Sequence, residues 1–159
     1  YIGGSMDDAV YSIDVDDSYD VYVAGGTNSS NFPTTLGAYR TTYFGGTADA
    51  FVSHISNNGN NLIASNYYVD SLYDQDFFVR TDKQNDVYIT GQTKAKDSSL
   101  VHNADYYTLN SGQFIAKFNN TLNAMEWSTV FGTGSGKPNI SITAFLSFLT
   151  YSLAFDKNK

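Results

Sequence analysis

The chain has 159 residues, contains no cysteine and carries a formal net charge of −7 at pH 7. This length permits one domain with a hydrophobic core, and the lack of cysteine excludes a disulfide framework and thiol chemistry. The negative charge disfavours nucleic acid as a partner, and no apolar run is long enough for membrane insertion.

The composition favours short strands and tight turns. The chain has 13 glycines, 13 tyrosines and 11 phenylalanines, and aspartate supplies almost all of its acidic residues. Aspartate, asparagine and glycine are typical of turns, whereas tyrosine, phenylalanine, valine and isoleucine are typical of strands. We therefore expect an all-β protein, and the acidic surface fits an extracellular location.

The first part of the chain predicts four strands. The first of them places Tyr11, Ile13 and Val15 on one face by strict alternation. The second is apolar on both faces, which is typical of a strand that is covered on both sides. The four strands are expected near residues 10–15, 20–25, 50–55 and 61–67.

A second unit then repeats the first at an offset of about 65 residues. Asp20–Thr27 returns as Asp86–Thr93, and Phe51–Ile55 returns as Phe114–Phe118. The first strand of this second unit places Phe77, Val79 and Thr81 on one face. Its strands are expected near residues 76–81, 86–91, 113–118 and 124–131.

A third unit begins but does not complete itself. Tyr1–Ser5 corresponds to Val130–Gly134, and Tyr11–Asp16 returns as Tyr151–Asp156. Four-stranded repeats that stack face to face form β-propeller blades. We thus expect two full blades of four antiparallel strands plus part of a third, as a fragment of a larger propeller or assembly. The predicted boundaries are 1–66, 67–129 and 130–159, with an insertion at 138–148.

Four motifs in order carry a resemblance to a known family. They are Tyr-Ile-Gly-Gly-Ser-x-Asp-Asp at 1–8, Asp-Val-Tyr-Val-Ala-Gly-Gly-Thr at 20–27, Asn-Phe-Pro-Thr-Thr-x-Gly-Ala-Tyr at 31–39 and Gly-Gly-Thr-x-Asp-Ala-Phe-Val at 45–52. This unit resembles the bacterial seven-bladed β-propeller (SBBP-type) repeat family. The second unit lacks the Asn-Phe-Pro segment and the glycine pair, and the third is interrupted.

The resemblance implies a secreted or cell-surface protein, in the style of Bacteroidota proteins that use type IX secretion. It implies no catalytic activity. We expect a structural or interaction module of an adhesin, an extracellular filament or a scaffold. Its expected partners are other blades or copies of the same protein, with surface proteins or glycans as further possibilities.

Aspartates at the first predicted hairpin are candidate calcium ligands. Asp14, Asp16 and Asp20 offer carboxylates on a short loop, as calcium sites do. The repeat favours another interpretation, because Asp16 and Asp20 return as Asp82 and Asp86 whereas Asp14 is replaced by Arg80. Recurrent aspartates of this kind bond the amides of their own turn. Calcium is the one cofactor left open.

The two histidines carry little signal by themselves. His54 aligns with Lys117 in the repeat, which predicts a solvated strand face on the side opposite to Phe51. His102 lies between Asp97 and Asp105, where a surface loop is favoured over a metal or acid–base cluster. No nucleophile elbow, phosphate loop or zinc spacing is present, so no catalytic residue is predicted.

Loop aromatics are the candidate ligand-binding residues. Phe32 and Tyr39 lie in the long loop of the first unit, where exposed rings would stack on sugars. A carbohydrate-binding propeller is therefore the alternative function. Tyr43-Phe44 aligns with Tyr106-Tyr107, which favours repeated packing for these two pairs. Ser71, in Asp70-Ser71-Leu72, resembles a Bacteroidota O-glycosylation acceptor.

Overall fold

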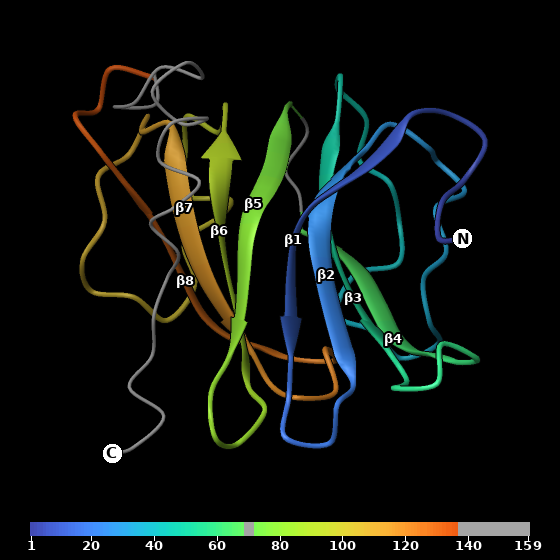
Figure 1. The fold of residues 1–159 in the computed structure, drawn as a ribbon. Coiled ribbons are helices and arrows are strands. Elements are labelled where there is room, and N and C mark those ends of the chain that lie inside the picture. The colour runs from blue at the N-terminus through green and yellow to red at the C-terminus, as the bar shows by residue number, and fades with distance from the viewer. Residues whose placement is uncertain (69–71, 137–159) are drawn as a thin grey trace.

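The computed structural model describes residues 1–68 and 72–136 as an all-β protein without a helix. Its eight strands form two four-stranded antiparallel sheets, each in simple sequential order (Figure 1). Sheet 1 consists of β1 (Asp8–Val15), β2 (Val21–Thr27), β3 (Asp49–Ile55) and β4 (Leu62–Tyr68). Sheet 2 consists of β5 (Asp74–Thr81), β6 (Val87–Thr93), β7 (Gln113–Phe118) and β8 (Met125–Phe131).

All eight strands that the repeat predicts are present within about two residues of their expected ends. The two sheets also share their irregularities. A bulge interrupts the pairing of β1 with β2 between Val10 and Ser12, and a second one interrupts the pairing of β5 with β6 between Asp76 and Phe78. Because Asp76 is the repeat equivalent of Val10, the repeat extends to the bulges that bend and twist each sheet.

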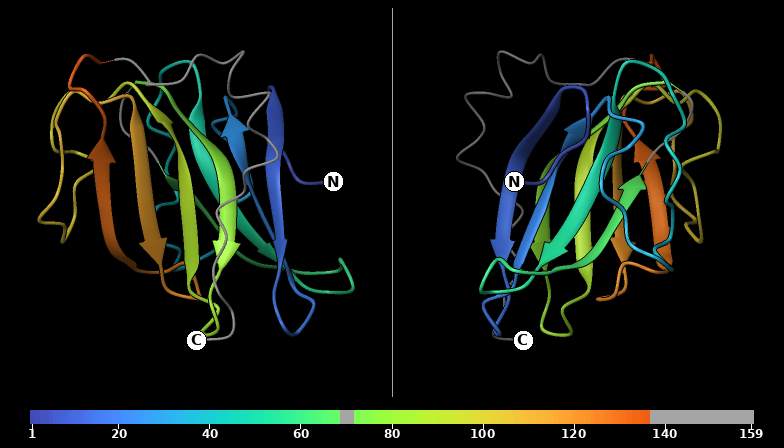
Figure 2. Two further views of the ribbon diagram at one scale, coloured as in Figure 1. Left: turned by 60° about the vertical axis from the view of Figure 1, so that its left-hand side comes forward. Right: turned by 90° about the vertical axis from the view of Figure 1, so that its right-hand side faces the viewer.

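The sheets pack face to face, and their first strands lie side by side. Figures 1 and 2 show β1 and β5 next to each other and running in the same direction. The main hydrophobic core lies between the sheets, where Tyr68 of sheet 1 packs against Phe114 and Phe118 of sheet 2. A smaller core covers the far face of sheet 1, where Phe51 and Tyr67 meet Phe32 from the loop after β2.

The two sheets stack in the same sense, with equivalent faces pointing in the same direction. Phe51 points away from sheet 2, while its repeat equivalent Phe114 points toward sheet 1. The opposite face of sheet 1 is buried against sheet 2, with Tyr22, Val52 and Tyr68 each at most 2% exposed. Its repeat equivalents on the outer face of sheet 2 are only half-buried; they include Tyr88, Ile115, Trp127 and Phe131.

This stacking explains why β2 is buried on both faces, as the sequence predicted. The residues from Tyr22 to Gly26 are all buried. Tyr22 and Ala24 belong to the core between the sheets, and Val23 belongs to the core on the far side. A strand with apolar residues on both faces is therefore stabilised by apolar burial in both cores.

Hydrogen bonds from β5 to β1, and from β4 to the turn between β7 and β8, also join the two sheets. The Val79 amide donates to Ser12 Oγ at 3.1 Å, and the Thr81 amide donates to Asp14 Oδ2 at 2.7 Å. Asn66 Nδ2 donates to the Leu122 carbonyl at 3.1 Å. These bonds fix the relative position of the sheets more specifically than apolar packing does.

The apolar face that the sequence predicts on each first strand is buried in β5 and exposed in β1. In β5, Val79 and Thr81 are fully buried, but in β1 Ile13 is 59% exposed and Val15 is 40% exposed. Sheet 1 covers β5, whereas no other described element covers this edge of β1. Burial here depends on the neighbouring sheet and not on the alternation alone.

Several expectations fall outside the described residues or stay predictions. The insertion at 138–148 and the segment Tyr151–Asp156 lie outside the described residues. The two described sheets do not close into a ring, so a propeller stays a prediction. In the described ranges, no helix is long and apolar enough to cross a membrane.

Candidate functional site

The hairpin turns that end β1 and β5 have the same hydrogen bonds. Asp16 Oδ1 accepts the amides of Ser18 and Asp20 at 2.8 and 3.0 Å. Asp82 Oδ1 accepts the amides of Gln84 and Asp86 at 2.9 and 3.0 Å. The predicted hairpin role of these aspartates is thus confirmed, and each turn leaves its second aspartate available for other contacts.

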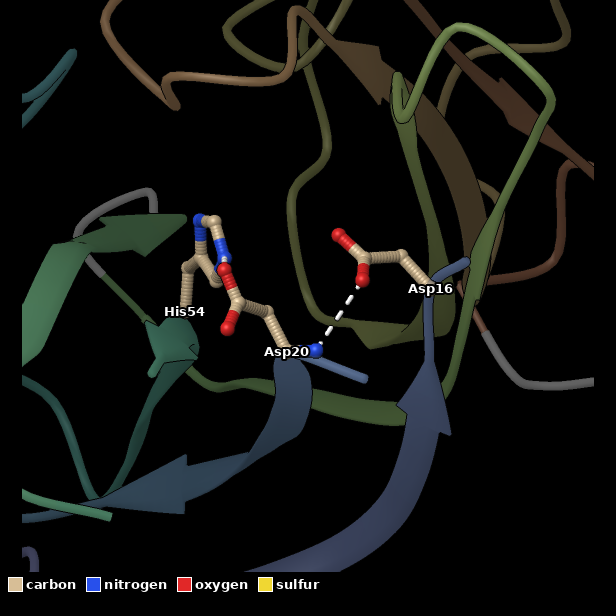
Figure 3. A group of neighbouring side chains, drawn as sticks. All are labelled: Asp16, Asp20 and His54. Carbon is tan, nitrogen blue, oxygen red and sulfur yellow. Dashed lines mark hydrogen bonds and ion pairs between the residues drawn. The ribbon is translucent and has the colours of Figure 1, made fainter. Parts of the chain in front are cut away.

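In sheet 1 this turn meets a histidine. Figure 3 shows Asp16 and Asp20 beside His54, which comes from the end of β3. His54 Nε2 lies 3.3 Å from Asp20 Oδ2, and one ligand atom from each of the three residues lies within 4.8 Å of the others. Among the described residues this is the only such group of three or more histidine, cysteine and acidic side chains.

The side chains of this cluster are held from outside it. Asp20 Oδ1 accepts the Asn57 amide at 2.7 Å, which leaves Asp20 Oδ2 directed at the imidazole. The His54 ring stacks on Tyr22, with centroids 4.1 Å apart and planes inclined by 17°. Each group therefore has a fixed orientation before any ligand arrives.

The expectation that His54 lies on a solvated face is wrong. Its side is correctly predicted as opposite to Phe51, but sheet 2 covers that side of sheet 1, and His54 is only 8% exposed. Burial lowers the pKa of His54 below 6.5, against the opposing effect of the hydrogen bond and charge of Asp20. The imidazole is therefore held neutral at pH 7. Its Nδ1 atom is buried without a hydrogen-bond partner among the described residues.

In sheet 2 the equivalent position holds a permanent cation. Lys117 Nζ lies 2.7 Å from Asp86 Oδ2, 3.9 Å from Asp82 Oδ2 and 2.7 Å from Glu126 Oε2. It also lies over the Tyr88 ring, at 5.5 Å from the centroid. Partial desolvation acts to lower the pKa of Lys117, but hydrogen bonds to Asp86 and Glu126 outweigh it and raise the pKa above its usual value.

Asp14 does not belong to the cluster, although the sequence grouped it with Asp16 and Asp20. Its Oδ2 accepts the Thr81 amide and the Thr81 hydroxyl across the sheet interface, at 2.7 and 3.1 Å. Arg80 Nη1 lies 3.9 Å from Asp14 Oδ1. Asp14 therefore joins the two sheets, and His54 takes its place beside the other two aspartates.

The loop aromatics proposed as ligand-binding residues are packing residues in the structure. Phe32 is 3% exposed, with its ring centroid 4.3 Å from that of Phe51, so the expectation of an exposed ring is wrong. Tyr39 is half-buried and packs edge-on against Phe118 at 5.6 Å. The buried Phe32 ring presents no free face on which a sugar would stack, whereas the role of the half-buried Tyr39 stays a prediction.

The predicted packing of the two aligned pairs holds only for one residue. Tyr43 packs edge-on against Tyr67. Phe44 is 53% exposed beside Arg40, and Tyr106 and Tyr107 are 75% and 48% exposed. The expected packing is therefore wrong for these three rings, which keep about half or more of their surface exposed.

The remaining candidates lie apart from the cluster. His102 is exposed and forms an isolated bridge with Ser128, and its Nε2 lies 3.0 Å from Asn103 Nδ2. It joins no metal-ligating group among the described residues. Ser71 lies outside the described residues, so its role as an acceptor stays a prediction.

The burial of the Asp76 carboxyl group was not predicted. Asp76, beside the bulge of β5, has no exposed surface, and neither of its oxygens has a hydrogen-bond partner in the described part of the chain. Burial, followed by the nearby Asp74 carboxylate, raises the pKa of Asp76 well above its ordinary value. Its repeat equivalent Val10 is exposed, so the alternation of the sequence gave no signal for this burial.

Comparison with known proteins adds no family to this description. No protein-family model matches the sequence, and no curated protein is similar to it.

Proposed function

We propose that this chain is a non-catalytic structural or interaction module, in which each four-stranded sheet is one blade of a β-propeller. The observation that carries the proposal is the stacking of sheets 1 and 2 in the same sense. An arrangement in which equivalent faces point the same way leaves one unsatisfied face at each end of the stack. It therefore extends by addition of further units.

The outer face of sheet 2 supports this proposal residue by residue. Its half-buried residues Tyr88, Ile115 and Trp127 are the equivalents of Tyr22, Val52 and Ala64, which sheet 2 buries. Large apolar side chains on a sheet face indicate a contact surface. We propose that a further copy of the same four-stranded unit covers this face, supplied by the same polypeptide or by another copy.

The biological setting of the proposal follows the SBBP-type resemblance. The module would belong to a secreted or cell-surface bacterial protein of an adhesin, filament or scaffold type. Protease treatment of intact cells of the source organism tests this setting. We expect loss of the protein without loss of a cytoplasmic marker, and complete protection of the protein would contradict the proposed location.

Self-association of the chain tests the contact surface. We expect the 159-residue chain to form oligomers by analytical ultracentrifugation, and we expect Ile115→Lys to shift it toward the monomer. Leu36→Lys is the control, because Leu36 is fully exposed in the loop between β2 and β3 and lies in neither sheet. A wild-type chain that stays monomeric across all concentrations, or an effect of Leu36→Lys equal to that of Ile115→Lys, would overturn the proposed surface.

A further inference from the structure

The interface between the two sheets combines a large side chain on a turn with a small one on the facing sheet. The turn between β7 and β8 carries Leu122, which is fully buried in the core between the sheets. The Leu122 carbonyl accepts the Tyr39 amide at 2.9 Å and Asn66 Nδ2 at 3.1 Å. Ala64 lies two residues before Asn66 on the same face of β4 and belongs to the same core. The turn of sheet 2 thus contributes a large residue where the face of sheet 1 has a small one.

At the equivalent positions on the two outer faces the sizes are exchanged. The repeat equivalent of Leu122 is Gly59, on the turn between β3 and β4, and the equivalent of Ala64 is Trp127 on β8. Both turns have the same backbone, because each of these two turn residues donates its amide to the carbonyl three positions earlier and has a positive φ, 72° and 54°. Trp127 is half-buried on the outer face of sheet 2, with its ring 6.2 Å from that of Tyr88. The large residue is therefore on the sheet face, and the turn has none.

The outer face of sheet 1 has a cavity of about 280 Å³ beside Gly59. Gly59 is exposed, and a Cβ atom added there would have nothing within 4 Å. The cavity is lined by four apolar residues and two asparagines, which are Ile2, Pro33, Ile55, Leu62, Asn60 and Asn61. An indole requires apolar surroundings for its rings and an acceptor for its N–H group. The lining of this cavity contains residues of both kinds.

We propose that Trp127 of one copy of this chain inserts into the cavity beside Gly59 of a second copy. The contact rests on the proposed function, since it uses the outer face of sheet 2, and it continues between two copies the stacking that sheets 1 and 2 have within one. Trp127 and the cavity lie on opposite outer faces, so one copy does not bring them together.

The sizes of the side chains also decide which sheet of the second copy docks. A second copy that docked through its own sheet 2 would place Leu122 against Trp127, which are two large side chains at one position. Docking through sheet 1 places Gly59 there instead. Because two different surfaces meet, the contact is heterologous and generates a ring or a filament.

Trp127 is the only tryptophan of the sequence, so fluorescence reports directly on the proposed contact. We expect the emission of the 159-residue chain to shift to shorter wavelength as its concentration rises, together with oligomer formation in the ultracentrifuge. Trp127→Ala and Gly59→Leu should each weaken self-association about 10-fold or more. Both should fold, because sheet 1 has Ala64 and sheet 2 has Leu122 at the equivalent positions, and circular dichroism checks this. Gly37→Leu is the matched control, at an exposed glycine outside the cavity, and should associate as the wild type does.

A mixture of the two variants tests whether the contact is heterologous. The Gly59→Leu chain keeps Trp127, and the Trp127→Ala chain keeps the cavity, so we expect a dimer with one chain of each and no larger species. The fluorescence of this mixture comes only from the Gly59→Leu chain and should shift as in the wild type.

Unchanged association of folded Gly59→Leu, a mixture that stays monomeric, or loss of association in Gly37→Leu would overturn the proposed contact. If Ile115→Lys still dissociated the wild-type oligomers in that case, the outer face of sheet 2 would remain the contact surface of the proposed function. A wild-type chain that stays monomeric at all concentrations would overturn both proposals.

Discussion

The hairpins at residues 16–20 and 82–86 have the same backbone hydrogen bonds and the same pair of aspartates, yet their surroundings differ. In sheet 1 the pair faces His54, whose side chain is 10% exposed, and in sheet 2 it faces Lys117, whose side chain is 15% exposed. Burial lowers the pKa of the imidazole, whereas hydrogen bonds to Asp86 and Glu126 raise the pKa of the ammonium group. The same turn therefore accommodates a neutral or a charged partner at similar burial.

The largest expected effect tests whether equivalent residues of the two sheets are equally important. Phe51 and Phe114 are fully buried in different cores. Truncation of either residue to alanine should lower the free energy of unfolding by about 3–5 kcal/mol, because each leaves a cavity of one aromatic ring. Denaturant melts give the values. Phe44→Ala is the control, because a half-exposed ring should cost less than about 1 kcal/mol. A loss below 1 kcal/mol for either core variant would contradict its placement.

The next effect separates the two hairpin clusters. His54→Ala should lower the free energy of unfolding by about 1–3 kcal/mol, because it removes the Tyr22 stacking partner and leaves Asp20 Oδ2 without its buried contact. Lys117→Ala should cost at least as much, because its side chain is only 15% exposed and its loss leaves Asp82, Asp86 and Glu126 without their counter-charge. Urea melts compare the two variants. A cost well below about 1 kcal/mol for Lys117→Ala would show that these ion pairs behave as solvent-screened surface pairs.

The third prediction concerns the pH dependence of stability that the buried Asp76 of β5 confers, at a position where β1 has the exposed Val10. The pKa of Asp76 is higher in the folded state than in the unfolded state. Above pH 3.8 the folded protein therefore keeps a proton on Asp76 that the unfolded chain has lost. The stability that this group contributes is therefore complete below pH 3.8 and is lost as the pH rises through the folded-state pKa. Asp76→Asn cannot ionise, so its stability relative to wild type should increase between pH 4 and pH 8. Thermal melts across this range give the difference, and a constant difference would show that Asp76 does not titrate as its burial requires.

The smallest effect is the pH dependence that His54 confers. Because its folded-state pKa lies below 6.5, the unfolded chain binds the proton more readily, and the contribution of His54 to stability is complete above pH 6.5 and declines as the pH falls. The decline should be measurable between pH 7 and pH 5.5. His54→Gln should remove this part of the slope, while Lys117→Gln should leave it in place. Equal slopes in wild type and His54→Gln would contradict a depressed pKa.

The sequence by itself determined the strands, their order within each unit and the turn chemistry. Short alternating segments and recurrent aspartates are local features, and a strand period of two residues assigns each side chain to a face. For this reason the repeat placed His54 correctly opposite Phe51, and it predicted the turn bonds of Asp16 and Asp82.

Only the tertiary structure decided which of those faces is buried. His54 and Lys117 occupy the same position in the repeat, but sheet 2 covers the first and no other described sheet covers the second. The same dependence on neighbours exposes Val10 in β1 and buries Asp76 in β5. A repeat alignment compares each residue with its equivalent and carries no information about the sheet beyond. Burial, and the pKa shifts that follow from it, depend on that neighbouring sheet.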